Sequence, residues 1–372
     1  MLDRPDVPAN GAVFADRDQR RAGTWPAAQP GRAERGDPVG GGGEQPGHSG
    51  LVGGSAVPDG HPSLRRPVHG PILPARRPPR HPTRGGREYA WAVLRLGGAA
   101  RLLTVADLPA LRPLLDRDPV AHCFVASRVE AAGVDPWRLG AELWGYGTPR
   151  LEAACFSGAN LVPVGDAPAA LAAFADRARR QGRRCSSIVG PAHAVGALWE
   201  RLEPYWGPAR EVRATQPLLA ISTAPLVAGD PAVRRVTLEE LEILMPACVA
   251  MFTEEVGTSP LANDNGAAYR ARVRDLVLAG RAFARIENGR VLFKAELGAV
   301  SDRVAQIQGV WVDPAQRGQG LGTAGTAAVV AEALRTVAPT VSLYVNDFNH
   351  AARRAYERVG LSNVGTFASV LF

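Results

Sequence analysis

The sequence is short of lysine, cysteine and long apolar runs, and the last two of these shortages each exclude a class of protein. Of the 43 basic residues only Lys294 is a lysine, a bias typical of the coding habit of a GC-rich genome. No run approaches the roughly 18 apolar residues of a membrane span, and the first residues lack the order of a secretion signal. The four cysteines show neither CxxC nor metal-ligand spacing, which argues against a disulfide framework and a metal site; they are Cys123, Cys155, Cys185 and Cys248. We therefore expect a soluble, reduced, cytoplasmic protein with no membrane partner.

What the sequence does contain is enough chain for two domains. It has 372 residues, of which 46% are hydrophobic and 21% charged, a globular composition. The formal net charge is +7, but residues 1–92 hold 13 arginines against 9 acidic residues. The rest of the chain therefore carries only about +3, which does not require a nucleic-acid partner.

Residues 1–92 differ in composition from the rest. They contain 16 glycines and 14 prolines, and no helical or strand period persists in them. Apolar side chains are too sparse to offset the entropy of ordering, so we predict a disordered segment. Two further interpretations stay open: a basic arm that grips phosphates, and an upstream extension from a mis-assigned start, with translation beginning near Val93.

A first ordered domain is predicted over residues 93–228. Leucines at positions 108, 111, 114 and 115 share one face of a helix over 106–115. Further periodicity predicts helices over 167–181 and 194–202 and strands over 151–156, 160–164, 186–189 and 217–222. The Ala, Pro and Gly break at 223–231 marks the domain boundary.

A second domain is predicted over residues 229–372, and it opens as the first does. Residues 102–108 and 235–241 both run from a strand through a threonine and an acidic turn into a leucine-rich helix. This internal echo suggests two related domains in tandem. Strands are predicted over 282–287 and 290–299, and Asn288-Gly289 between them is a hairpin signal.

The chemistry is carried by a glycine-rich turn between a strand and a helix. The predicted strand 304–312 runs into residues 313–323, and a helix of small residues continues to 334. Glycines at 318, 320 and 322 let the backbone approach an anion at the positive end of that helix, and Arg317 can add a charged contact. The spacing fits neither a Walker loop nor a dinucleotide-binding fingerprint.

A second motif follows the next strand, predicted over 340–345. A helix is predicted over 351–359, with Gly360 closing it; Asn349 before the helix and Ala352 and Tyr356 within it follow one another at offsets of three and four residues. Together, the Arg-x-x-Gly-x-Gly turn and this Asn-x-x-Ala-x-x-x-Tyr-x-x-x-Gly pattern resemble the GCN5-related N-acetyltransferase (GNAT) superfamily. The resemblance covers about residues 232–372, with Leu361 in place of the usual phenylalanine.

The resemblance implies a fold, an activity and a site. The fold is α/β, with a mixed, mostly antiparallel sheet flanked by helices, here two copies in tandem. The activity is transfer of an acetyl group from the co-substrate acetyl-CoA directly to a primary amine. Asn349 contacts the cofactor near the bend of its pantetheine arm, and Tyr356 is the general acid for the departing thiolate. The backbone of Val310, Trp311 and Val312 pairs with that arm, and the pyrophosphate lies on Gly318, Gln319, Gly320, Leu321, Gly322 and Thr323.

The general base is less well marked. An alkylammonium with a pKa of about 10.4 is roughly 0.04% neutral at pH 7, so a base that removes its proton is needed. Strand 304–312 has no carboxylate, and Tyr344 stands where some relatives place a glutamate. The candidates are Glu296 on the neighbouring strand and Glu255 after the first helix of the domain. For each of them the alternative is an ordinary solvated glutamate with no catalytic role.

The first ordered domain lacks both motifs, so we expect a degenerate GNAT-like copy that serves as a lid or acceptor-site wall. Tandem members such as mycothiol synthase have this plan, and the arginine usage suits an actinobacterial source. The acceptor, a small molecule or a protein with a free amine, is not named by the motifs. The alternative function is a non-catalytic acyl-CoA-binding sensor or scaffold.

Overall fold

The computed structural model describes residues 98–372, except 149 and 263, and all of these lie in one structural unit. The predictions for residues 1–92, whether disorder, a basic arm or a mis-assigned start, fall outside the described residues. We call the elements from β1 to β6 the first half and those from β7 to β12 the second half.

The first half alternates helices with strands in the order β1, η1, α2–α4, β2–β4, α5, β5, α6 and β6. Its helices are η1 (Val105–Asp107), α2 (Leu108–Leu115), α3 (Cys123–Ala132), α4 (Pro136–Leu139), α5 (Pro168–Gln181) and α6 (Ala192–Trp206). Its strands are β1 (Arg101–Leu102), β2 (Glu142–Tyr146), β3 (Ala153–Ser157), β4 (Asn160–Val164), β5 (Ser187–Pro191) and β6 (Glu211–Ile221).

The second half repeats that order, apart from the shortest helices. Its helices are η2 (Leu238–Glu240), α7 (Leu241–Val256), η3 (Asp264–Gly266), α8 (Ala267–Leu278), η4 (Pro314–Gln316), α9 (Leu321–Thr336) and α10 (His350–Val359). Its strands are β7 (Arg234–Arg235), β8 (Ala282–Glu287), β9 (Arg290–Val300), β10 (Val304–Val312), β11 (Thr340–Tyr344) and β12 (Ser362–Leu371).

The echo seen in the sequence has a structural counterpart at the start of each half. Thr104 and Asp107 form a capping box at η1, and Thr237 does the same with Glu240 at η2. In each half an arginine six residues before the acid binds it at 2.6 Å, Arg101 to Asp107 and Arg234 to Glu240. Both halves therefore enter their first helix through the same side-chain arrangement.

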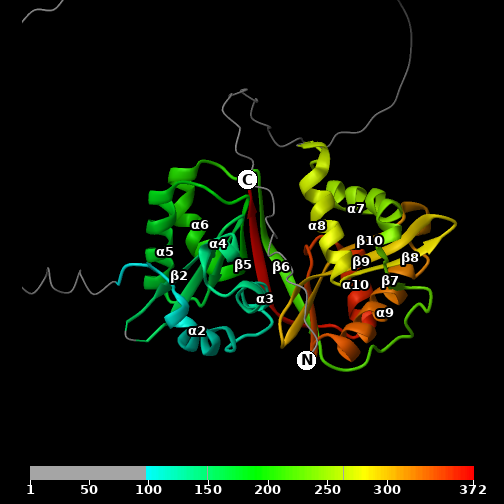
Figure 1. Cartoon of the computed structure of the whole chain (residues 1–372), viewed down its shortest axis with the longest axis horizontal. Helices are drawn as coiled ribbons and strands as arrows, with labels where there is room; N and C mark the ends of the chain where they lie inside the picture. The colour runs from blue at the N-terminus through cyan, green and yellow to red at the C-terminus, as the bar shows by residue number, and fades with distance from the viewer. Residues whose placement is uncertain (1–97, 149, 263) are drawn as a thin grey trace, which may run out of the picture. The chain divides into compact units, whose positions relative to one another are not determined.

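All twelve strands of the described residues belong to one sheet, in which the two halves exchange their last strands. The strand order is β1-β2-β3-β4-β5-β12-β6-β11-β10-β9-β8-β7. Within the part of the chain that the structure describes, the pairs β4–β5 and β10–β11 alone are parallel. The last strand of the second half, β12, pairs with β5 of the first, while β6 of the first half pairs with β11 of the second. Figure 1 shows β12 and β6 side by side, and their antiparallel ladder joins the halves.

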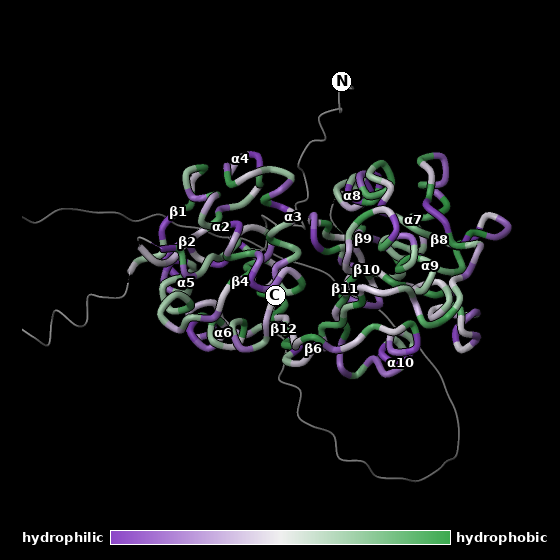
Figure 2. Tube along the Cα trace, turned by 90° about the horizontal axis from the view of Figure 1, so that it is seen from below, coloured by the Kyte–Doolittle hydropathy of each residue, from purple (hydrophilic) through white to green (hydrophobic). Residues whose placement is uncertain are grey.

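Helices bury the apolar faces of this sheet. In the first half α5 and α6 cover one cluster, with Phe174 and Leu198 fully buried. In the second half α9 and α10 pack on a cluster around Phe293, and α7 and α8 pack on the opposite cluster of β8 and β9. Figure 2 shows the outer helix α10 in hydrophilic colour, in keeping with its arginines. Among the described residues, none of the helices has both the length and the apolar character of a bilayer crossing.

The predicted fold class is confirmed: the sheet is mixed, mostly antiparallel and flanked by helices. The Asn288-Gly289 turn is also confirmed, because both residues have a positive φ, as a two-residue hairpin turn requires. Helices α3 and α8 and strand β2 were not predicted, and β6 begins six residues earlier than expected. The four cysteines are buried free thiols.

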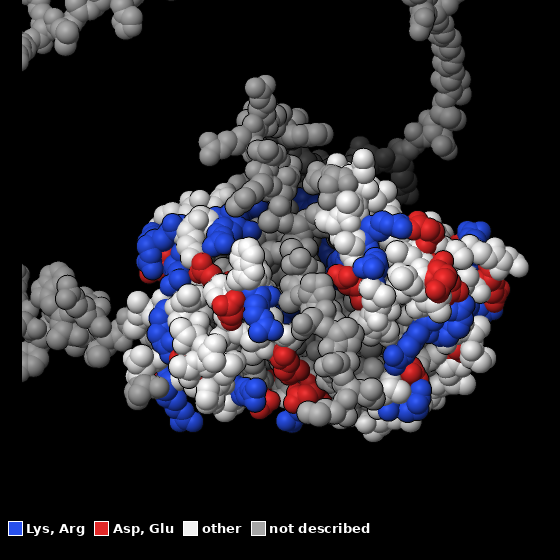
Figure 3. Space-filling view, in the orientation of Figure 1, with Lys and Arg blue, Asp and Glu red and all other residues white. Residues whose placement is uncertain are grey.

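Charges of both signs are interspersed on the face in Figure 3. Many of the arginines there and elsewhere are paired with a carboxylate, for example Arg285 with Asp230 at 2.9 Å and Arg235 with Glu332 at 3.1 Å. This mixture is typical of an ordinary protein surface.

Candidate active site

Strands β10 and β11 part at a bulge. Their parallel ladder covers only Val304–Gln306 against Thr340–Ser342. On the other edge of β10 the register with β9 shifts between Gln308 and Trp311, where Gly309 has a φ of +58°. Of the predicted pantetheine-binding residues, Val310 lies within this register shift and Trp311 and Val312 lie beyond it; within the described residues their β11-facing edge has no ladder partner.

The turn from β10 into α9 presents a row of backbone donors. Gly318 and Gly320 have φ values of +79° and +84°, which residues with a side chain rarely adopt. Within the part of the chain that the structure describes, the backbone N–H groups of the five consecutive residues 318–322 have no acceptor. The helix behind them is 16 residues long and its first turn holds no acidic residue. These donors and the helix dipole fit a diphosphate.

Arg317 and Trp311 are tied to the end of α7 by Glu254. The Arg317 guanidinium donates to the Glu254 carboxylate at 2.8 Å and to the Val312 carbonyl oxygen at 3.1 Å. The Trp311 indole donates to the other oxygen of Glu254 at 3.1 Å. Sequence reasoning did not foresee this use of Arg317, and the Gln319 amide likewise donates to the Ala315 carbonyl at 3.4 Å.

Helix α10 positions the two residues of the second motif that are expected to act on the cofactor, Asn349 and Tyr356. Asn349 is the N-cap, and its side-chain oxygen accepts from the Ala352 N–H at 3.1 Å. Tyr356 is buried, two turns along, and its hydroxyl makes no hydrogen bond to any described residue. Burial, and then the negative charge of Glu255, raise the pKa of Tyr356, so the phenol stays protonated and able to donate.

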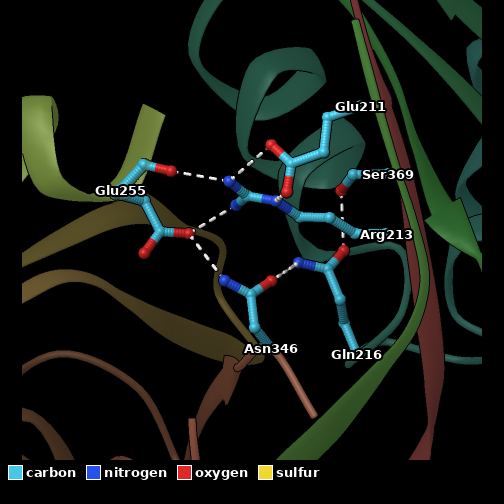
Figure 4. A network of polar contacts seen from close by, with 6 residues as sticks. All are labelled: Glu211, Arg213, Gln216, Glu255, Asn346 and Ser369. Atoms are coloured by element: carbon cyan, nitrogen blue, oxygen red, sulfur yellow. Dashed lines mark hydrogen bonds and ion pairs between the residues drawn. The ribbon is translucent and has the colours of Figure 1, made fainter. Parts of the chain in front are cut away.

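Glu255 lies at the centre of a polar network drawn in Figure 4. One carboxylate oxygen, Oε1, accepts from Arg213 at 2.6 Å and from the Asn346 amide at 3.1 Å. Arg213 also donates to the Glu255 backbone oxygen at 2.6 Å and to Glu211 at 2.8 Å. The second oxygen, Oε2, has no partner among the described residues, as the figure shows. The carboxylate is thus held at one oxygen and open at the other.

The same network continues to the exchanged strands. The Gln216 amide donates to the Asn346 side-chain oxygen at 2.9 Å, and the Ser369 hydroxyl donates to Gln216 at 2.7 Å. Arg213 and Gln216 come from β6, in the first half, and Ser369 comes from β12. The first half therefore supplies side chains to the neighbourhood of Tyr356.

Glu296 lies in a separate, buried cluster. Lys294 donates to its Oε2 at 3.0 Å and Arg272 to its Oε1 at 3.2 Å, and Lys294 is also 3.6 Å from the Cys248 sulfur. Burial alone would raise the pKa of Glu296, but Lys294 and then Arg272 outweigh it and lower that pKa. The cluster lies beside the bulge, because a Cβ on Gly309 would be 3.1 Å from both the Lys294 and the Glu296 side chains.

The two predicted bases are therefore placed differently. Among the acidic residues described, only Glu255 is close enough to Tyr356 to affect its pKa. Of the two predicted bases, only Glu255 keeps a carboxylate oxygen without a partner among the described residues. Sequence reasoning missed Arg213, Gln216 and Asn346. The signal available was weak: Glu211 and Arg213 alternate on a strand whose predicted start was 217. No group of residues that could hold a metal ion occurs in the described part of the chain.

Comparison with known families assigns a class to this site. Residues 244–361 match a family model described as the acetyltransferase (GNAT) family. Residues 141–244 match another, described only as a domain of unknown function, DUF4081. No curated protein matches the chain. The segment 244–361 thus belongs to the GNAT acetyltransferases, and the chain carries an acyltransferase domain of a family that uses acetyl-CoA.

One solved structure agrees with the fold, and two others are reported as similar chains. A Drosophila protein is 12% identical, with a TM-score of 0.53 over 74% of this chain and 99% of that chain. A GCN5-related N-acetyltransferase from Sphaerobacter thermophilus is 16% identical, with a TM-score of 0.45 over 74% and 96%. A tandem GNAT protein from the clavulanic acid biosynthesis pathway is 15% identical, with a TM-score of 0.41 over 73% and 98%.

Proposed function

We propose that the protein transfers an acetyl group from acetyl-CoA directly to the primary amine of an acceptor. The observation that supports this most is the row of five backbone N–H groups at residues 318–322, which have no acceptor among the described residues. Such a row at a helix N-terminus suits a pyrophosphate, and it lies inside the segment that matches the GNAT family. We keep residues 93–228 as a proposed degenerate copy and 229–372 as the proposed catalytic domain.

The cofactor would lie along three segments: the glycine turn, the edge of β10 at the bulge, and the start of α10. Residues 318–323 would hold the pyrophosphate, and the open edge of Val310–Val312 would pair with the pantetheine arm. Asn349 would lie near the bend of that arm while capping α10. Acetyl-CoA supplies a thioester, which an amine opens by forming a C–N bond while the C–S bond breaks.

Glu255 would accept the proton that the amine loses, and Tyr356 would donate the proton that the departing sulfur gains. Glu255 Oε2 would take the proton of the amine, directly or through one water, since it has no partner among the described residues. Such a base is typically worth about 10²–10⁴ in rate. The Tyr356 hydroxyl would donate to the departing sulfur. We favour Glu255 over Glu296 because two cations occupy both oxygens of Glu296.

Calorimetric titration of acetyl-CoA into the full chain tests the cofactor site. A Gly320→Glu variant should lose binding, because it adds a negative charge where the phosphates would lie. Gly207→Glu is a matched control: both glycines have a positive φ, +77° and +84°, and neither would place a Cβ within 4 Å of another atom. Loss of binding in both variants, or in neither, would contradict this assignment.

Release of free thiol with a panel of amines then tests turnover. An enzyme should release CoA with at least one amine and slow markedly in a Tyr356→Phe variant that still binds acetyl-CoA. Tight binding with no release, unchanged by that substitution, would favour the sensor or scaffold instead.

A further inference from the structure

A pocket lies between the outer edge of the sheet and one face of helix α9. Its lining consists of residues 233–235 and 283 on the strand side and of four residues of α9 between 328 and 335. We call it the edge pocket, because β7 is the last strand of the sheet. Its volume is about 570 Å³. Pockets of about 300–1,000 Å³ are typical of small-molecule sites, so a ligand of moderate size would fit.

The floor of the edge pocket is apolar. Phe283 is fully buried at its base, with Val233 beside it on the strand side. Ala328 and Ala331 stand three residues apart on the same face of α9, and their short side chains leave room above Phe283. Such a floor can bury the hydrocarbon part of a ligand.

The rim of the edge pocket carries a surplus of positive charge. Glu332 is paired with Arg235 at 3.1 Å and also with Arg335, so two cations share one carboxylate. Arg234 has its own counter-charge, because it donates to both oxygens of Glu240, at 2.6 and 2.8 Å. Within the described residues, one cation of the rim is therefore left without a carboxylate.

Two of these guanidinium groups keep donors for a ligand. Arg235 and Arg335 each use only Nη2 on their partners, and among the described residues their Nε and Nη1 groups have no acceptor. The Arg235 guanidinium lies over the Phe283 ring at 5.7 Å, which brings the charged rim next to the apolar floor. A guanidinium with two free donors suits a carboxylate or a phosphate.

The edge pocket is distinct from the segment assigned to the phosphates of acetyl-CoA. Those donors are the backbone N–H groups of residues 318–322 at the start of α9, whereas the lining of the pocket begins at Ala328. Six helical residues correspond to about 9 Å along the axis. The proposed cofactor site therefore does not account for the pocket.

We propose that the edge pocket binds a small amphipathic anion. The hydrocarbon part would lie on Phe283 and the two alanines, and the carboxylate or phosphate would lie on Arg235 and Arg335. This is a second ligand site of the chain, and it does not depend on the proposed acetyl transfer.

Saturation-transfer NMR on the full chain tests the site with four probes: hexanoate, hexyl phosphate, hexanamide and acetate. Hexanamide lacks the charge, and acetate lacks most of the hydrocarbon. We expect at least one of the two hexyl anions to bind about tenfold or more tighter than both of these controls. The tighter of the two anions identifies the head group that the rim prefers.

Three variants locate the binding. Arg335→Gln should weaken binding of the preferred anion about tenfold, because it removes a charged donor. Ala331→Trp should abolish binding by filling the pocket, and Ala271→Trp, at an exposed position on α8, is the matched control. Glu332→Gln should tighten binding about threefold or more, since it frees both guanidinium groups from their carboxylate. Misfolding cannot produce that gain in affinity.

Other outcomes would overturn the proposal. Equal binding of the hexyl anions and hexanamide, binding that survives Ala331→Trp, or weaker binding in Glu332→Gln would each do so, as would no binding of either anion. Competition between the bound anion and CoA would assign the pocket to the cofactor and would equally refute a separate site.

Discussion

Replacing Arg213 by methionine should weaken both the fold and the reaction, because one side chain from β6 fixes the end of α7 and the carboxylate of Glu255. The Arg213 side chain is only 10% exposed, whereas its carboxylate partners Glu211 and Glu255 are 40% and 50% exposed. Water can therefore solvate both acids once the arginine is gone, and each pair contributes at most about 1 kcal/mol. The bond to the Glu255 carbonyl at the helix end adds about 0.5–1.5 kcal/mol.

The expected loss of unfolding free energy is therefore about 1–3 kcal/mol, measured by urea denaturation. Glu255 keeps only the Asn346 amide at Oε1, and a carboxylate that moves by about 1 Å should reduce kcat/KM up to about 10²-fold in the thiol-release assay. Arg213→Lys should lie between, because an ammonium lacks the planar fork that serves four oxygens at once. Arg201→Met, exposed on α6, is the control. The reasoning fails if Arg213→Met leaves both stability and kcat/KM unchanged.

Three further predictions follow from single contacts. Tyr356→Phe should lower kcat about 10²-fold or more. Calorimetry should show unchanged acetyl-CoA affinity and denaturation unchanged stability, because the hydroxyl has no hydrogen bond to a described residue. The Arg101 guanidinium lowers the pKa of Asp107 from 3.8 to about 2, so its stabilisation is complete above about pH 4 and lost as the pH falls toward 2. Asp107→Asn should therefore lower the free energy of unfolding by about 1 kcal/mol at pH 6, a figure that allows for solvent screening, and by little at pH 2. Urea denaturation at the two pH values measures both. Lys294→Met should lower the free energy of unfolding by about 3–5 kcal/mol, because it leaves buried Glu296 with one cation. The Lys294→Met/Glu296→Leu double variant should regain part of that loss. If the effects of the two substitutions are additive instead, this pairing is contradicted.

The elements that the sequence predicted well are those with a strong local signal. The hairpin at Asn288-Gly289 needs two residues that tolerate a positive φ, and these two residue types do. The strand, glycine turn and helix around Gly320 are likewise contiguous in the chain. Helix α3 was not predicted, because it packs between the rest of the first half and strands β9 and β10. Its buried residues therefore do not form one apolar stripe. The predicted start of strand β6 was too late because Glu211 and Arg213 at its true start are charged. Arg213 is paired with Glu255, which lies 42 residues further along the chain.

The candidate site divides in the same way. Tyr356, Asn349 and the residues of the glycine turn lie in two short motifs, and it was the resemblance of these motifs to the GNAT superfamily that made them candidates. Arg213 and Gln216 come from a half with neither motif, and no local pattern in the sequence marks them. Only the pairing of β6 with β11 brings them to the second half, and such long-range pairing is not encoded in local periodicity.

The exchange of β6 and β12 explains why a first half without catalytic motifs belongs to this site. In the sheet, β6 stands next to β11, so its side chains emerge beside the segment that carries Asn346 and the start of α10. Strand β12 extends from α10 into the first half and pairs with β5. The polar network of Figure 4 crosses this exchange, from Ser369 through Gln216 and Asn346 to Glu255. The first half, which carries neither motif, thus completes the sheet and fixes the Glu255 carboxylate through Arg213.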